Sequence, residues 1–216
     1  MDILLCPSIL NLVVDDFVHE IIELDEAGCD IFHIDIMDGH FVPNFGMGLP
    51  DFEAVRANTK KLVDVHLMIT DPGRYVELFS QKGADIIYIH PEADIHPART
   101  LSKIRSLGKQ PGIAINPGTS IESVKELFAL TDYVMPMAVN PGYAGQVYLD
   151  YVEPKIIRLA KMKDQYGFKV VVDGGINEEN LTRLFHAGVD GYVLGIYILF
   201  KQKQKYKTII DHLHRI

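Results

Sequence analysis

Residues 31–44 read Ile31-Phe32-His33-Ile34-Asp35-Ile36-Met37-Asp38-Gly39-His40-Phe41-Val42-Pro43-Asn44. The apolar first part of this segment, Ile31–Ile36, predicts a buried β-strand, yet it carries His33 and Asp35 two positions apart. Alternate residues of a strand point to the same face, so these two side chains project together. A buried carboxylate is unfavourable without a partner, and a divalent metal ion is the simplest one. The segment therefore predicts a metal site whose other ligands lie elsewhere in the chain.

Apolar runs of the same kind recur along the whole chain and alternate with amphipathic, helix-like stretches. The repeat of roughly 25 residues suits a βα unit, and the continuous apolar character is typical of parallel strands. We predict eight strands: Ile3–Cys6, Ile31–Ile36, Leu62–Leu67, Ile86–His90, Pro111–Ile115, Tyr133–Val139, Val170–Asp173 and Gly191–Leu194.

A short Gly-x-Asp signature precedes three of these runs. It reads Gly28-Cys29-Asp30, Gly83-Ala84-Asp85 and Gly188-Val189-Asp190, and Thr131-Asp132 is a weaker copy. Glycine in a left-handed conformation ends a helix, and the short polar residue turns the chain into the next strand. The signature therefore supports a regular alternation of helix and strand.

The eight units predict one domain, residues 1–216, folded as a closed (β/α)₈ barrel. No Ser/Gly-rich linker interrupts the pattern. An open, doubly wound sheet is the alternative. It is disfavoured because no G-x-G-x-x-G motif follows the first strand.

Composition narrows the functional class. The net charge of −8 argues against binding of nucleic acid through a basic surface. The two cysteines, Cys6 and Cys29, show no CxxC spacing and are expected to be buried free thiols. Neither a signal peptide nor a membrane-spanning run is evident, so we expect a cytoplasmic protein without a membrane partner.

Four polar residues at predicted strand ends form a candidate metal site. In a barrel, the carboxyl ends of the strands converge on one face, where catalysis takes place. His33, Asp35, His66 and Asp173 offer two imidazoles and two carboxylates, which suit Zn²⁺, Fe²⁺, Mn²⁺ or Co²⁺. Taken singly, such a histidine is more often a hydrogen-bonded core residue and such an aspartate a helix N-cap. The combination of all four favours a metal ion.

Asp35 and Asp173 also form a candidate acid/base pair. They belong to well-separated strands and are expected to face a ligand from opposite sides. Two such carboxylates can remove a proton from one face of a carbon acid and return one to the other. The alternative is that both are only metal ligands.

Glycine-rich segments follow the predicted strands 6, 7 and 8. They are Asn140–Gln146, Gly174-Gly175 and Gly195. Backbone amides in such loops bind phosphate, and barrels of this type commonly bind phosphate at the last two strands. Tight turns are the alternative explanation for each glycine taken alone.

Three methionines, Met37, Met68 and Met137, stand at or just after strand ends. They are interpreted either as core filling or as an apolar surface that keeps water away from a reactive intermediate.

Five motifs then occur in order along the chain. They are Pro7-Ser8-Ile9-Leu10, the H-x-D-x-M-D-G-x-F-V-P-N run His33–Asn44, Asp64-Val65-His66-Leu67-Met68, the N-P-G-x-x-G-Q loop Asn140–Gln146, and Val172-Asp173-Gly174-Gly175-Ile176. With these motifs the chain resembles the ribulose-phosphate 3-epimerase family over essentially its whole length.

The resemblance implies a (β/α)₈ barrel that epimerises a ketose phosphate at C3, with D-ribulose 5-phosphate and D-xylulose 5-phosphate as the expected pair. It implies one divalent metal ion on His33, Asp35, His66 and Asp173, with Asp35 and Asp173 as the acid/base pair. It further implies homo-oligomers. The implied substrate contacts are Ser8, His66, Gly142, Tyr143, Ala144, Gly145, Gly174, Gly175, Gly195 and Ile196.

The chain departs from the family pattern at three places. Asn11-Leu12-Val13 stands where S-A-D is usual, Ala144 replaces a common glycine, and Ile196 replaces a serine or threonine. The last change removes a hydroxyl donor to phosphate, worth roughly 1.5–3 kcal/mol. Ala144 and His90-Pro91-Glu92 also resemble the related allulose-6-phosphate 3-epimerases, which leaves a hexulose 6-phosphate open as the substrate.

Two other functions are weaker. A sugar-phosphate decarboxylase or lyase on the same fold needs a lysine in a D-x-K-x-x-D arrangement, and Asp35-Ile36-Met37-Asp38 has none. A non-catalytic barrel that binds sugar phosphate would be indicated by loss of an acid/base carboxylate, but both are present.

Overall fold

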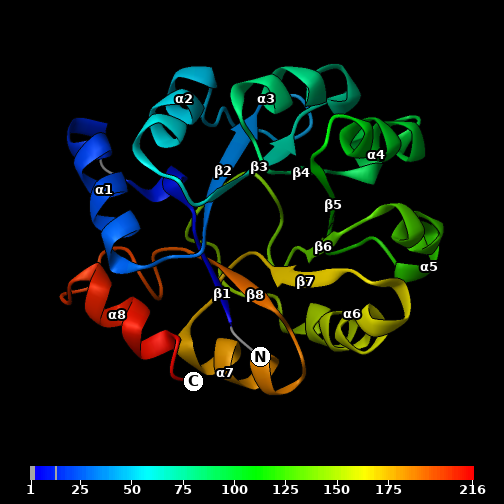
Figure 1. The fold of residues 1–216 in the computed structure, drawn as a ribbon. Helices are drawn as coiled ribbons and strands as arrows, with labels where there is room; N and C mark the ends of the chain where they lie inside the picture. Colours follow the sequence, from blue (N-terminus) through cyan, green and yellow to red (C-terminus); the bar gives the residue numbers. More distant parts are fainter. Residues whose placement is uncertain (1–2, 13) are drawn as a thin grey trace.

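The computed structural model describes residues 3–12 and 14–216 and shows a barrel of parallel strands ringed by helices (Figure 1). Val13 lies outside the described residues. The strands are β1 (Leu4–Pro7), β2 (Ile31–Met37), β3 (Leu62–Met68), β4 (Ile86–Ile89), β5 (Gln110–Ile115), β6 (Tyr133–Pro136), β7 (Lys169–Val172) and β8 (Gly191–Leu194). All eight predicted strands are confirmed.

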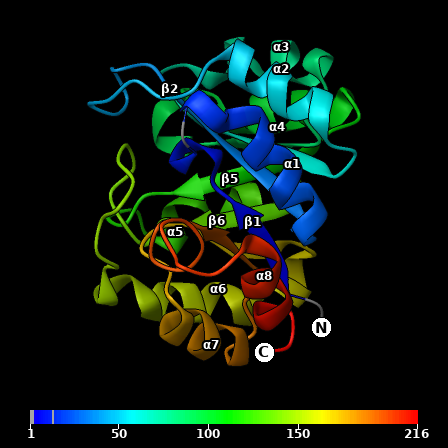
Figure 2. The same cartoon turned by 90° about the vertical axis from the view of Figure 1, so that its left-hand side faces the viewer.

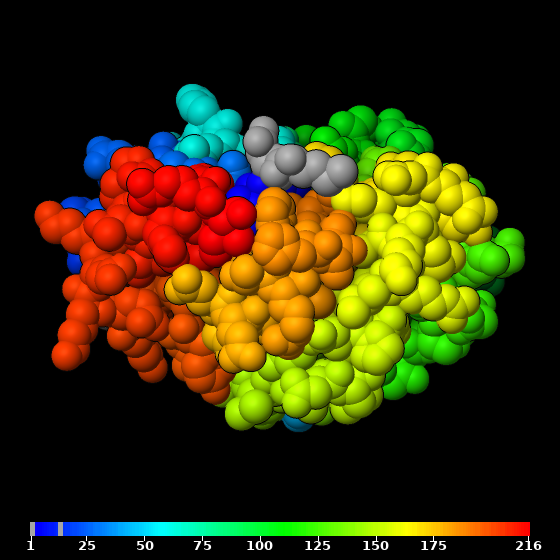
Figure 3. Space-filling model, turned by 90° about the horizontal axis from the view of Figure 1, so that it is seen from below, coloured from blue at the N-terminus to red at the C-terminus, as the bar shows by residue number. Residues whose placement is uncertain are grey.

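Helices follow the strands around the outside of the barrel. The α-helices are α1 (Phe17–Ala27), α2 (Leu49–Asn58), α3 (Val76–Lys82), α4 (Pro97–Ser106), α5 (Ile121–Val124), α6 (Glu153–Tyr166), α7 (Glu178–His186) and α8 (Tyr206–Leu213). Short 3-10 helices are η1 (Ile9–Asn11), η2 (Val14–Asp16), η3 (Pro72–Arg74), η4 (Pro91–Ala93), η5 (Lys125–Leu130) and η6 (Asp150–Val152). In Figure 3, α7 lies between α8 and α6 on the outer surface.

The sheet closes on itself. Its order is β1-β8-β7-β6-β5-β4-β3-β2, and every pair is parallel. A parallel bridge between Ser8 and His33 then joins the end of β1 to β2. The (β/α)₈ barrel is therefore confirmed, and the open-sheet alternative is wrong.

β6 is the one strand whose end differs clearly from the prediction. It stops at Pro136 instead of Val139, and Met137 forms only an isolated bridge with Asp173. The apolar run continues past the strand because Ala138 and Val139 are buried in the loop that follows. Apolar sequence alone does not separate a strand end from a buried loop.

Side chains fill the barrel interior and leave room for a site only at its mouth. Tyr88 of β4 is fully buried and packs edge-on against Tyr133 of β6. Its ring occupies space that only glycine leaves free, since a Cβ on Gly112 of β5 would overlap it. Cys6 and Cys29 are buried and free, as predicted. In Figure 2 the loops after β2 and β6 project on one side, away from the two chain ends.

The Gly-x-Asp signature clamps neighbouring strands together at the opposite end of the barrel. Each aspartate donates its backbone N–H to the carbonyl of a residue on the preceding strand and accepts that same residue's N–H on its carboxylate. The pairs are Asp30 with Leu5, Asp85 with Val63, and Asp190 with Val170, with N–H to carboxylate distances of 2.9, 2.9 and 2.8 Å. The signature therefore ties β1 to β2, β3 to β4 and β7 to β8.

The weaker copy at Asp132 forms only half of this clamp. Its N–H donates to the carbonyl of Pro111 at 2.8 Å, but proline has no N–H to return. The carboxylate pairs instead with Arg105 at 2.8 Å, where both side chains are substantially exposed to solvent.

No helix in the described ranges is both long and apolar enough to cross a membrane.

We predict that Asp190→Ala lowers the free energy of unfolding by about 3 kcal/mol. The change leaves the Val170 N–H without its acceptor and the ammonium of Lys163 without a carboxylate that lies 2.5 Å away. Lys163 is nearly buried, so water replaces little of this loss. Urea unfolding of the variant and the wild type measures the difference.

Asp132→Ala is the matched control. It removes a carboxylate from the same position of the repeat, but its ion-pair partner Arg105 is exposed, and among the described residues no backbone N–H loses an acceptor. We expect a loss below about 1 kcal/mol. Equal losses in both variants would contradict the clamp.

Candidate active site

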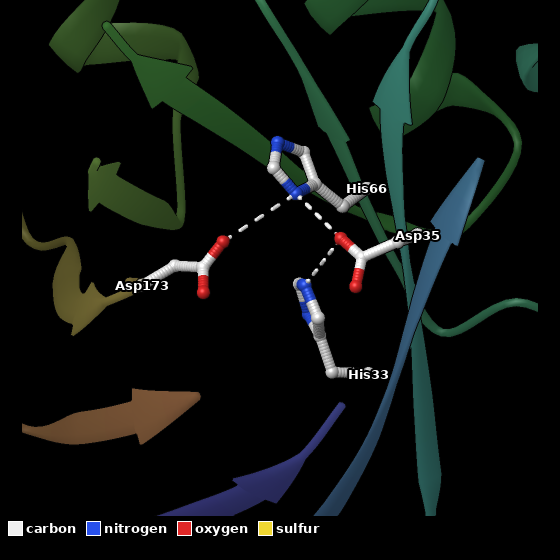
Figure 4. A group of neighbouring side chains, drawn as sticks. All are labelled: His33, Asp35, His66 and Asp173. Atoms are coloured by element: carbon white, nitrogen blue, oxygen red, sulfur yellow. Dashed lines mark hydrogen bonds and ion pairs between the residues drawn. The ribbon is translucent and has the colours of Figure 1, made fainter. Parts of the chain in front are cut away.

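Four side chains converge at the mouth of the barrel (Figure 4). His33 and Asp35 come from β2, His66 comes from β3, and Asp173 directly follows β7. One donor atom from each residue lies within 4.8 Å of the donors of the other three. The structure thus brings together all four predicted ligands.

The register of the strands explains this convergence. Asp35 is paired with His66 across β2 and β3, and the Nδ1 of His66 lies 3.2 Å from Oδ1 of Asp35. Nε2 of His33 lies 3.2 Å from the same oxygen. Asp173 approaches from the other side of the barrel, with Oδ2 3.9 Å from Nδ1 of His66 (Figure 4).

This group fits a divalent metal ion. His33 and His66 are fully buried, and Asp35 is 5% exposed, so water screens these charges poorly. Two carboxylates that face each other at this depth repel unless a cation lies between them. Imidazole nitrogens with carboxylate oxygens are ligands for zinc, iron, manganese and cobalt.

The same group separates the acidities of the two candidate acid/base residues. Burial alone would raise the pKa of Asp35, but the imidazoles of His33 and His66 hold that pKa well below its usual range. Burial and the nearby charge of Asp35 raise the pKa of Asp173 to about 6, against the weaker opposing effect of the histidines. Asp35 is therefore a carboxylate near neutral pH, whereas Asp173 takes up a proton readily.

A cavity opens above this group and is enclosed by the loops that follow the strands. It includes about 570 Å³ of space when the open solvent at its mouth is counted. Asp35 and Asp173 line it together with nine of the ten predicted substrate contacts: Ser8, Gly142, Tyr143, Ala144, Gly145, Gly174, Gly175, Gly195 and Ile196. His66, the tenth, is fully buried beside Asp35.

The methionines and Ser8 shape the wall nearest to the carboxylates. Met37, Met68 and Met137 all line the cavity, so an apolar surface surrounds the carboxylates. The hydroxyl of Ser8 donates to Oδ2 of Asp35 at 2.8 Å and fixes the orientation of that carboxylate.

Backbone conformation makes the glycine loops after β7 and β8 suitable for an anion. Gly175 has φ +65°, and a Cβ on it would lie 2.5 Å from the backbone nitrogen of Tyr148. Among the described residues, the N–H groups of Gly175 and Ile196 have no hydrogen-bond partner within the protein. No lysine or arginine lies among the described residues that line the cavity, and these two backbone amides are among the donors that remain for a phosphate.

The residues that lie behind the histidines of the candidate metal site were not predicted from the sequence. Asp64 is 1% exposed, and its Oδ1 lies 2.7 Å from Nδ1 of His33. Burial alone would lower the pKa of His33, but Asp64 and Asp35 raise it well above the usual value. The signal was present in the sequence, because Asp64 and His66 stand two apart on a strand just as His33 and Asp35 do.

A second pair, His90 and Glu92, lies behind His66. Burial lowers the pKa of His90 to about 4. Burial alone would raise the pKa of Glu92, but the nearby ring of His90 and hydrogen bonds from Thr119 and Asn116 hold it at about 2. His90 ends a predicted strand, but nothing in the sequence shows that it contacts His66.

Comparison with known proteins identifies similar chains. The model of the ribulose-phosphate 3 epimerase family matches residues 4–199. Ribulose-phosphate 3-epimerase of Bacillus subtilis is 40% identical over 208 residues, which cover 95% of both chains. The Synechocystis protein of the same name is 42% identical and covers 90% of this chain and 86% of its own. The crystal structure of phosphoribosyl anthranilate isomerase from Thermus thermophilus superposes with a TM-score of 0.68 at 12% identity over 99% of both chains, which shows the shared fold.

We predict that Asp173→Asn changes the pH dependence of stability in the metal-free protein. Because the pKa of Asp173 is higher in the folded chain than in the unfolded chain, the folded state binds more protons between about pH 4 and pH 6. Stability from this group therefore falls as pH rises through that window. The variant lacks this loss, so its free energy of unfolding rises by up to about 3 kcal/mol relative to that of the wild type between pH 4 and pH 7.

Urea unfolding in the presence of a chelator at several pH values measures this difference. Asp164→Asn, an exposed aspartate on α6, is the control and is expected to show no such trend. A difference between Asp173→Asn and the wild type that stays constant with pH would contradict the assignment.

Proposed function

The chain belongs to the ribulose-phosphate 3-epimerase family, an isomerase family acting on carbohydrates, and we propose that it interconverts D-ribulose 5-phosphate and D-xylulose 5-phosphate by proton transfer at C3. The observation that carries this proposal is the placement of Asp35 and Asp173. They reach the same centre from β2 and from the end of β7, on opposite sides of the barrel axis (Figure 4).

The two carboxylates are matched to a two-face proton transfer. Asp35, kept ionised by His33 and His66, removes the C3 proton from one face of the substrate. Asp173, whose pKa is raised to about 6 in the metal-free protein, delivers a proton to the other face. The roles exchange in the reverse reaction. Inversion at C3 follows because the proton leaves and returns on different faces.

His33, Asp35, His66 and Asp173 would hold one divalent metal ion. When bound, such an ion supplies positive charge that stabilises negative charge developing on the substrate oxygens. The buried donor set supports this proposal, and zinc, iron, manganese and cobalt all suit it.

Other residues of the cavity position the substrate and exclude water. Ser8 holds the carboxylate of Asp35 in place through a 2.8 Å hydrogen bond. Met37, Met68 and Met137 surround the reacting carbon with apolar surface, which disfavours unwanted protonation by water. The glycine loops after β6, β7 and β8 would bind the phosphate through backbone N–H groups.

A pentose phosphate is favoured over a hexulose 6-phosphate because the similar curated chains carry the name ribulose-phosphate 3-epimerase. The net charge of −8 is consistent with a small-molecule substrate and with no nucleic-acid partner. We also propose that the protein is cytoplasmic and that it forms homo-oligomers, the latter as the family resemblance implies. Sedimentation equilibrium of the full chain measures its subunit number.

We predict that the protein incorporates deuterium from D₂O at C3 of ribulose 5-phosphate when Zn²⁺ or Fe²⁺ is supplied. Removal of the C3 proton leaves a site that solvent deuterium fills on its return, and NMR of the recovered sugar phosphates detects it. Asp35→Asn and Asp173→Asn are expected to lower turnover by about 10³-fold, because each removes one proton carrier.

Asp164→Asn makes the same change of charge at an exposed residue that does not line the cavity. This variant is expected to turn over substrate like the wild type. Absence of deuterium incorporation by the wild type with either metal would overturn the proposed reaction. Wild-type turnover by Asp173→Asn would remove Asp173 from the acid/base role.

We predict that Ile196→Ser lowers KM for ribulose 5-phosphate by about tenfold and leaves kcat nearly unchanged. The new hydroxyl donates to a charged phosphate, which is worth roughly 1.5–3 kcal/mol and acts equally in ground and transition states. Ile196→Ala, which removes the same side chain without adding a donor, is the control. An equal effect of both variants on KM would show that a hydroxyl at this position does not reach the phosphate.

A further inference from the structure

The nitrogen of His66 that faces away from the metal ligands has a buried partner. Nδ1 of His66 is directed toward Asp35 and Asp173, whereas Nε2 lies 2.8 Å from Nε2 of His90. The two rings are stacked, with centroids 5.0 Å apart and an interplanar angle of 27°. Both side chains are fully buried, so water does not take the place of either partner.

The ring of His90 is held rigidly. Phe41 packs against it with centroids 4.8 Å apart, and η4 begins immediately after it. Its second nitrogen, Nδ1, lies 3.6 Å from Oε2 of Glu92 and has no other polar partner among the described residues. His90 is thus placed between an imidazole and a carboxylate.

Glu92 is fixed as a hydrogen-bond acceptor. Its Oε1 accepts the N–H of Asn116 at 2.9 Å and the hydroxyl of Thr119 at 2.5 Å. The loop that supplies these donors is itself held by Lys155 of α6, whose ammonium donates to the carbonyls of Asn116, Pro117 and Thr119 at 2.8, 3.0 and 3.0 Å. The carboxylate therefore has a defined position behind His90.

Glu92, His90 and His66 form a row of neighbouring polar groups. The direction of the hydrogen bonds along this row follows from the carboxylate acceptor of Glu92 at its end. A neutral imidazole carries one N–H and one acceptor nitrogen. A carboxylate facing Nδ1 of His90 favours the proton on that nitrogen, which leaves Nε2 of His90 as an acceptor. Nε2 of His66 must then be the donor, and Nδ1 of His66 presents its lone pair to the metal site.

We propose that Glu92 and His90 are positioning residues that fix the tautomer and orientation of His66 for metal binding. This inference rests on the proposed metal site. It extends that site to two residues that are not among the four candidate ligands and do not line the cavity. His33 shows the simpler form of the same arrangement, since Asp64 lies 2.7 Å from its Nδ1 and leaves Nε2 toward Asp35.

The experiment is long-range ¹H–¹⁵N NMR of the histidine rings in the Zn²⁺-loaded full chain, combined with the Zn²⁺ dissociation constant from chelator competition. In the wild type we expect the proton of His90 on Nδ1 and that of His66 on Nε2. In Glu92→Gln we expect loss of this preference at His90 and about a tenfold rise in the dissociation constant.

Three controls keep the result specific. Glu122→Gln makes the same change at an exposed residue of α5 and is expected to leave affinity and tautomers unchanged. The ring of His33, held by Asp64, serves as an internal reference that should not change. Thr119→Val removes one contact of Glu92 without altering its charge, so it tests the row even if Glu92→Gln does not fold, and a weaker loss of affinity is expected.

Each other outcome has one meaning. A proton on Nε2 of His90 in the wild type, or wild-type affinity in both Glu92→Gln and Thr119→Val, would overturn the proposed row while leaving the metal site standing. Failure of the wild type to bind Zn²⁺, Fe²⁺, Mn²⁺ or Co²⁺ would overturn the metal site itself, and the positioning role with it.

Discussion

The close approach of three carboxylates at one end of the barrel is the constraint on which the site depends. Asp35, Asp64 and Asp173 meet there among buried side chains, with His33 and His66 between them. At this depth charges interact strongly and water screens them little. Three of the four imidazole nitrogens of His33 and His66 face a carboxylate, and the fourth, Nε2 of His66, faces His90. The separation of the acidities of Asp35 and Asp173 is a direct result of the same arrangement.

Much of this could be predicted from the sequence, and the exceptions share a physical cause. The strands were predictable because parallel strands covered on both faces are continuously apolar. The convergence of the four candidate metal ligands was predictable because strand ends in a closed barrel converge. The predicted end of β6 at Val139 was wrong because Val139 lies in a loop that is as deeply buried as a strand. The contact of His90 with His66 depends on the registers of β3 and β4 and on ring orientation, which local sequence does not specify.

The two ends of the cavity differ in the number of charged side chains that line them. Around Asp35 and Asp173, charged side chains are concentrated and oriented by neighbours such as Ser8. Around Gly175 and Ile196, the described lining holds no lysine or arginine, and the backbone N–H groups of these two residues have no partner among the described residues. Recognition at that end is therefore sensitive to backbone shape, which makes the glycines with positive φ indispensable to it.

The aspartate clamps at the far end of the barrel restrict which residues can stand at the second position of the odd-numbered strands. Leu5, Val63 and Val170 each give an N–H to an aspartate carboxylate, so none of them is replaceable by proline. Pro111 occupies the equivalent position of β5, and there Asp132 is released to pair with Arg105 at the surface. At this end of the barrel a proline excludes the aspartate clamp, because proline has no N–H to donate to the carboxylate. The repeat is therefore interrupted at β5, where Pro111 stands.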